Sequence, residues 1–153
     1  MNPTPHRVLL CFLALTGAVT GGWAYFAPVH WYDTFPGLGM SWLPQLGPYN
    51  EHFAKDVGAF FLGLTVLSVL AFICVANTTL VRVTAGTWAV FNLLHLILHL
   101  QMLHHYSPRD QVLNVVALSA LLLASLALFI PFRRNDGSTG QDSRARSATG
   151  RPA

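Results

Sequence analysis

The chain has 153 residues, of which 53% are hydrophobic and only 10% are charged. Soluble domains usually carry about 25% charged residues, so this deficit, with a mean hydropathy of +0.47, indicates that lipid is the solvent. The net charge of +3 does not indicate nucleic-acid binding, because the basic residues lie at segment ends and in the C-terminal stretch rather than along one helix face. Cys11 and Cys74 stand far apart inside apolar runs and give no disulfide framework.

Four apolar segments are long enough to cross a membrane, since a bilayer core about 30 Å thick needs roughly 20 apolar residues in a helix. They cover about residues 8–27, 57–76, 83–103 and 112–132. We therefore expect an all-α fold, a membrane four-helix bundle formed by residues 1–132. Residues 133–153 contain almost no apolar side chain, so we expect a disordered cytoplasmic tail there.

The first segment has a second interpretation, a cleaved signal peptide with Arg7 as its basic start. The apolar run is long for a signal peptide, and it ends in aromatic residues and Pro28 rather than in a small-x-small cleavage site. These features favour a retained helix. Gly17 and Gly21 form a GxxxG pair, a pattern that allows close packing of helices in lipid.

The distribution of lysine and arginine predicts the orientation, because cytoplasmic loops carry an excess of both. If the N-terminus is inside, only Lys55 and Arg109 are outside. The other seven basic residues are then cytoplasmic: Arg7, Arg82, Arg133, Arg134, Arg144, Arg146 and Arg151. We therefore expect both chain ends in the cytoplasm. The long connection at residues 28–55, rich in aromatic residues and proline, should then lie on the outer face, with a short helix near residues 38–43.

Polar residues inside the third segment need an explanation, because polar groups in a membrane are costly and often functional. Asn92, His95 and His99 are spaced i, i+3 and i+7, so they share one helix face. His104 and His105 follow at the outer interface. The predicted orientation thus collects histidines in the outer half of the bundle.

The start of the second segment adds acids and another histidine at the same outer end. Glu51 and Lys55 are four residues apart, as are His52 and Asp56, so both pairs can interact along a helix. Further polar residues at this end come from the long connection and from the fourth segment: His30, Asp33, Arg109, Asp110 and Asn114.

This cluster has several interpretations. Histidines four residues apart can bind one metal ion, and a carboxylate from a neighbouring helix can complete the site. The predicted transition-metal ligands are His95, His99, Asp56, His52 and Glu51. The same imidazoles could instead relay protons, since histidine titrates near neutral pH. Haem is the least favoured ligand, because the histidines that could oppose the third helix sit too shallow.

A purely structural interpretation is that His95 and His99 hydrogen-bond Asp56, Asn92 or Asn114 across the bundle. Such interhelical bonds contribute on average about 0.6 kcal/mol in membranes. The stretch from His95 to His105 is similar in local spacing to the histidine boxes of membrane di-iron desaturases, but those enzymes need more histidines from separate cytoplasmic segments. The sequence identifies no catalytic residue, phosphate-binding glycine loop or nucleophile elbow.

The stretch PYNEHFAKDVGA at residues 48–59, with the histidine-rich third segment, is similar to segments of uncharacterised bacterial membrane proteins. The chain resembles the small four-helix bacterial proteins grouped as DoxX-like, over the four helices but not the tail. This resemblance implies a multi-pass protein of the bacterial plasma (inner) membrane. Members are linked with redox or sulfur metabolism, usually as membrane subunits beside a catalytic partner. The resemblance transfers no catalytic residue to this chain.

The sequence therefore predicts an accessory or structural membrane subunit with a polar outward site rich in histidine and acid. Its expected partners are the lipid bilayer and either another membrane protein or further copies of itself. The alternative is a redox or transport component that uses the histidines to bind a metal or relay protons.

Overall fold

The computed structural model describes residues 4–131, which form five α-helices. Four of them are long and apolar enough to cross a membrane. These are α1 (Thr4–Phe26), α3 (Glu51–Ile73), α4 (Thr78–Met102) and α5 (Pro108–Ala127). The predicted helical class and the four membrane-length helices are confirmed, and they are compatible with a multi-pass membrane protein. The tail predicted at residues 133–153 lies outside the described part.

The helices begin earlier than their apolar segments suggested. Side-chain oxygens of Asn50, Asn77 and Ser107 each accept a hydrogen bond from the backbone N–H three residues later, at 3.2, 3.1 and 3.3 Å. This bond satisfies a donor that a helix start otherwise leaves unpaired. Polar N-caps, rather than the beginning of the apolar run, therefore set the first residues of α3, α4 and α5.

Residues 28–50, which we name the cap segment, connect α1 to α3. They form α2 (Pro28–Thr34), a hairpin of β1 (Pro36–Gly37) and β2 (Met40–Ser41), and the 3-10 turn η1 (Leu43–Gln45). The short helix predicted at residues 38–43 is therefore misplaced. Proline suits the first turn of α2, whereas Gly37, Leu38 and Gly39 all have positive φ, at 97°, 56° and 78°, and turn the chain sharply.

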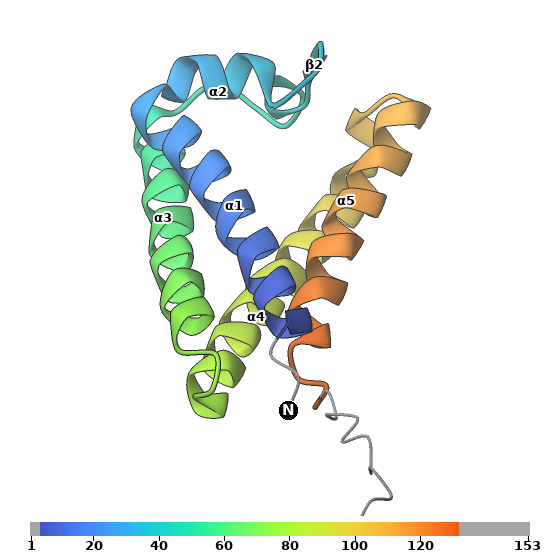
Figure 1. Cartoon of the computed structure of the whole chain (residues 1–153). Coiled ribbons are helices and arrows are strands. Elements are labelled where there is room, and N and C mark those ends of the chain that lie inside the picture. Colours follow the sequence, from blue (N-terminus) through green and yellow to red (C-terminus); the bar gives the residue numbers. More distant parts are fainter. Residues whose placement is uncertain (1–3, 132–153) are drawn as a thin grey trace, which may run out of the picture.

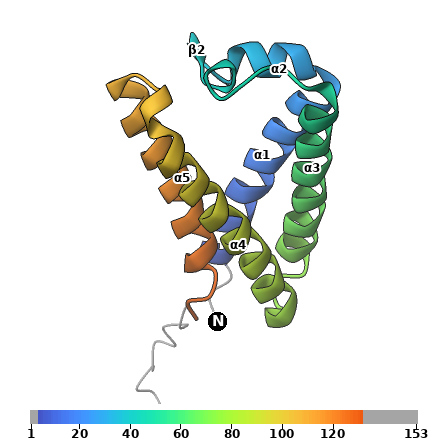
Figure 2. The same ribbon diagram turned by 180° about the vertical axis from the view of Figure 1, so that it is seen from behind.

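The spanning helices form two pairs that splay apart. Figures 1 and 2 show α1 beside α3 and α4 beside α5, with the pairs meeting where α1 begins and α5 ends and diverging toward the cap segment. We name these the terminal end and the cap end. At the terminal end, Nε2 of His6 lies 3.2 Å from the carbonyl oxygen of Leu128.

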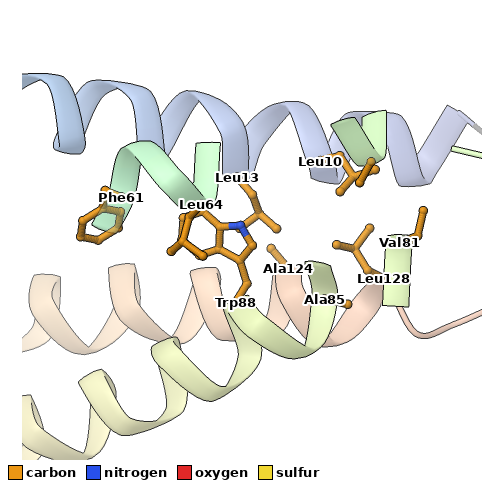
Figure 3. Close-up of a cluster of buried hydrophobic side chains, with 10 residues drawn as sticks. Leu10, Leu13, Phe61, Leu64, Val81, Ala85, Trp88, Ala124 and Leu128 are labelled. Atoms are coloured by element: carbon orange, nitrogen blue, oxygen red, sulfur yellow. The ribbon is translucent and has the colours of Figure 1, made fainter. Parts of the chain in front are cut away.

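All four helices share one hydrophobic cluster, which we name the terminal core (Figure 3). Its members are Leu10, Leu13, Phe61, Leu64, Ala71, Val81, Ala85, Trp88, Ala124 and Leu128. A smaller cluster of Ala24, Trp31 and Ala54 joins the cap segment to α1 and α3. The outward faces remain apolar, with Val19, Val66, Val90 and Val116 each at least 60% exposed, as expected of surfaces that face acyl chains.

Glycines bring α1 and α3 into backbone contact. A Cβ atom on Gly21 would lie 2.9 Å from the carbonyl oxygen of Gly58, and a Cβ on Gly58 would lie 2.6 Å from the backbone nitrogen of Tyr25. A Cβ on Gly17 would lie 2.6 Å from Oγ1 of Thr65. The close packing predicted from Gly17 and Gly21 is confirmed, and it makes α1 and α3 one tightly packed unit.

Candidate functional site

The buried face of α4 changes from apolar to polar along its length. From the terminal end it presents Val81, Thr84, Ala85 and Trp88, and then Asn92 and His99 toward the cap end. At about 1.5 Å per residue, Trp88 and His99 are separated by roughly 16 Å along the axis. Asn92 and His99 therefore share one face of α4, as predicted, and this face is the buried side of the helix.

The buried face of α5 changes in the same direction. Leu128 and Ala124 join the terminal core, whereas Asn114, near the start of α5, is 1% exposed. Because α4 and α5 are antiparallel neighbours, their polar ends coincide at the cap end. We name Asn92, His95, His99, Tyr106 and Asn114 the polar stripe.

Several buried atoms of the polar stripe have no hydrogen-bond partner within residues 4–131. They are Nδ2 and Oδ1 of Asn92, Nδ1 of His99, Oη of Tyr106 and Oδ1 of Asn114. An unsatisfied buried polar group costs about 1–3 kcal/mol, and buried polar groups in folded proteins nearly always have a partner. These atoms therefore do not form the hydrogen bonds that the structural interpretation expected between His99 and Asn92, Asn114 or Asp56.

Aromatic and imidazole rings form a continuous row along this face. The ring of Phe91 stacks on His95 with centroids 5.2 Å apart, and His95 lies 4.5 Å from His99. The rings of His99 and Tyr106 are nearly parallel at 6.4 Å, and Tyr106 contacts Trp42 of the cap segment edge-on at 6.1 Å. The row therefore runs from the middle of α4 to the cap segment.

The terminal core closes the other end of this row. Trp88 is completely buried, and its Nε1 donates a 2.8 Å hydrogen bond to Oγ of Ser68. That hydroxyl donates in turn to the carbonyl oxygen of Leu64 at 2.8 Å. Polar atoms next to the terminal core are thus satisfied, in contrast with those of the polar stripe.

The remaining predicted metal ligands, Glu51, His52 and Asp56, lie on α3, where each pairs with a residue four positions away on the helix surface. Nζ of Lys55 is 2.6 Å from Oε1 of Glu51, and Nε2 of His52 is 3.3 Å from Oδ2 of Asp56. The side chains of His52 and Asp56 are 80% and 61% exposed. These side chains lie on the exposed surface of α3 rather than against the buried face of α4.

The structure brings His95 close to His99 but does not gather all five predicted ligands. Within residues 4–131, no group of three or more histidine, cysteine, aspartate or glutamate side chains is arranged to hold a metal ion. The predicted metal site therefore gains no support from this geometry. His30 is used elsewhere, since its Nδ1 accepts a 2.8 Å hydrogen bond from Nε1 of Trp23.

Tyr106 is seven residues after His99, so the i, i+3, i+7 spacing of the third segment extends to it. It follows the 3-10 turn η2 (Leu103–His105), is 6% exposed, and stacks on His99. Burial and the nearby carboxylate of Asp110 raise the pKa of its phenol to about 12. Spacing could not show the turn that follows, in which the N-cap Ser107 begins α5 directly after Tyr106 and turns the chain back along α4.

The polar stripe is therefore a buried row of amide, imidazole and phenol groups, open to hydrogen bonding and closed at the terminal end. The chain matches no protein-family model, no curated protein and no solved structure.

Proposed function

We propose that the chain is an accessory multi-pass membrane protein that binds a small uncharged polar molecule in the polar stripe. The observation that carries this proposal is the set of five unpartnered polar atoms on the facing ends of α4 and α5 and on Tyr106 of their connection. A bound molecule with both donors and acceptors would satisfy them and remove the energetic cost of their burial.

The ligand is expected to be uncharged, because the buried polar side chains of the described part include amides, hydroxyls and imidazoles but no carboxylate, lysine or arginine. A charged molecule would need an opposite charge at this depth. As part of the same proposal, both chain ends are cytoplasmic, the cap end faces outward, and the protein resides in a bacterial plasma membrane, as the DoxX-like resemblance implies.

The experiment is native mass spectrometry of the detergent-purified protein. The wild type should retain a small-molecule mass that an Asn92→Leu/Asn114→Leu variant loses. Thr87→Val also replaces a polar side chain of α4 with an apolar one of nearly the same size, and this control variant should retain the small-molecule mass. A wild type that carries no such mass, or equal retention by the double variant, would overturn the proposal.

A second candidate function is a transport or redox component that relays protons through the stripe. It is favoured by the ring row, in which His95, His99 and Tyr106 follow one another toward the cap end. Imidazole and phenol groups can both donate and accept protons. Proton movement across liposome membranes that is unchanged in His95→Ala/His99→Ala would count against this second function.

A further inference from the structure

A cavity separate from the polar stripe lies between the cap segment and the first turns of α3. Its volume is about 210 Å³. Trp31, Leu43 and Leu46 line it from the cap segment, and Phe53, Ala54 and Val57 line it from α3. The inference drawn from it does not depend on the proposed function.

The cavity wall contains no charged side chain. Phe53, Ala54 and Val57 share one face of α3, while the two ion pairs of the same turns, Glu51 with Lys55 and His52 with Asp56, occupy the other positions. The wall therefore suits the uncharged part of a ligand.

The cavity is open beside the first turns of α3, at one end of a helix long enough to cross a membrane. Phe53 is 67% exposed and Val57 is 38% exposed, so both stand at the surface of a membrane-length helix. Val57 is six residues after the start of α3, about 9 Å along its axis. The aromatic residues of the wall are of the kind that is enriched where headgroups meet hydrocarbon.

Two hydrogen-bonding atoms in this wall have no partner. Nε1 of Trp31 and Oη of Tyr49 are buried without a hydrogen bond, and both residues line the cavity. The indole N–H can only donate, and the phenol can donate as well. A ligand that satisfies both must therefore carry acceptor oxygens, and a small shift of these two side chains would bring them into reach.

We propose that this cavity binds the ester-linked upper part of a phospholipid acyl chain from the leaflet at the cap end. The ester carbonyls supply the acceptors, and the first chain carbons fill the apolar space. A volume of about 210 Å³ is below the ~300 Å³ of typical small-molecule sites. A phospholipid is compatible with this small volume because only the upper segment of one acyl chain enters the cavity, and the rest of the lipid stays in the bilayer.

The test compares two phosphatidylcholines that differ only in ester or ether linkage of their chains. Purified protein is given both in equal amounts, and the retained lipid is measured by native mass spectrometry. Each hydrogen bond should favour the ester lipid by about 2- to 10-fold. Tyr49→Phe and Trp31→Phe should each reduce this preference, whereas Tyr32→Phe should not, because Oη of Tyr32 already donates to the carbonyl oxygen of Gly47 at 2.6 Å.

A second pair of variants tests the cavity itself. Val57→Phe should fill the mouth and lower retention of both lipids several-fold. Val66→Phe makes the same change on the lipid-facing side of α3, away from the cavity, and should retain lipid like the wild type. Equal retention of ester and ether lipids by the wild type would overturn the proposal. An equal loss of lipid retention in Val57→Phe and Val66→Phe would also overturn it.

Discussion

The amide of Asn92 is among the most deeply buried groups of the polar stripe, and replacing it with leucine tests the site directly. Asn92 is 1% exposed, and neither its nitrogen nor its oxygen has a hydrogen-bond partner in the described chain. Leucine is similar in size and has no polar atom to desolvate. Because an unsatisfied buried group costs about 1–3 kcal/mol, Asn92→Leu should raise the free energy of unfolding of the ligand-free protein by an amount in that range.

Ser68→Ala is the control, and it should change the free energy of unfolding in the opposite direction. Its hydroxyl accepts the hydrogen bond of the fully buried Trp88 indole, so alanine leaves that N–H unpaired beside the terminal core. The expected loss is about 1–3 kcal/mol. The two variants therefore change buried polar groups of the same bundle in opposite directions.

The assay is reversible unfolding in mixed detergent micelles with rising dodecyl sulfate, followed by tryptophan fluorescence. Asn92→Leu should unfold at higher dodecyl sulfate than the wild type, and Ser68→Ala at lower. A loss of more than about 1 kcal/mol in ligand-free Asn92→Leu would mean that the amide has partners within the folded chain, and it would refute the reasoning. Greater stability together with lost ligand mass would instead be typical of a binding residue.

Three further predictions concern packing, pH and orientation. Gly58→Ala should lower the free energy of unfolding by about 1–3 kcal/mol, because the added Cβ would meet the backbone of α1. Gly63→Ala has no atom within 4 Å of the added Cβ and should raise the free energy of unfolding by about 1 kcal/mol in the same assay. The phenol of Tyr106, with a pKa of about 12 instead of 10.0, stabilises the fold below pH 10 and loses this contribution as pH rises through 12; ultraviolet titration should show one late tyrosinate that is absent in Tyr106→Phe, and titration near 10 would contradict it. A reporter fused after Ala153 should be active in the cytoplasm and one inserted near Gly39 should be active outside, and the reverse result would overturn the orientation.

The spanning helices could be predicted because hydropathy is a local property of the sequence. Their first residues could not be read from hydropathy, since α3 and α5 begin where Asn50 and Ser107 form N-caps outside the apolar runs. The cap segment was harder, because its hairpin depends on positive φ values at Gly37, Leu38 and Gly39. Glycine there is compatible with a turn, but it does not by itself place the neighbouring helix.

The candidate site was predictable for α4 and for the start of α5, but not for α3. Spacing alone put Asn92 and His99 on one face, and both are buried. Spacing could not show that His52 and Asp56 would pair with each other on the exposed surface of α3, because that depends on how α3 is rotated against its neighbours. The interhelical prediction therefore holds for Asn114 of α5, which lies at the same end as His99, but not for the α3 residues.

The two helix pairs are packed together at one end and separated at the other, so each pair can tilt about the terminal core. They are joined around Trp88 in the terminal core, and at the far end the rings of Trp42 and Tyr106 touch across the gap between the pairs. From Trp88 to the end of α4 the arm is about 20 Å long, so a tilt of about 5° moves its tip by about 2 Å. A displacement of that size would separate the rings of Trp42 and Tyr106 with every helix remaining intact.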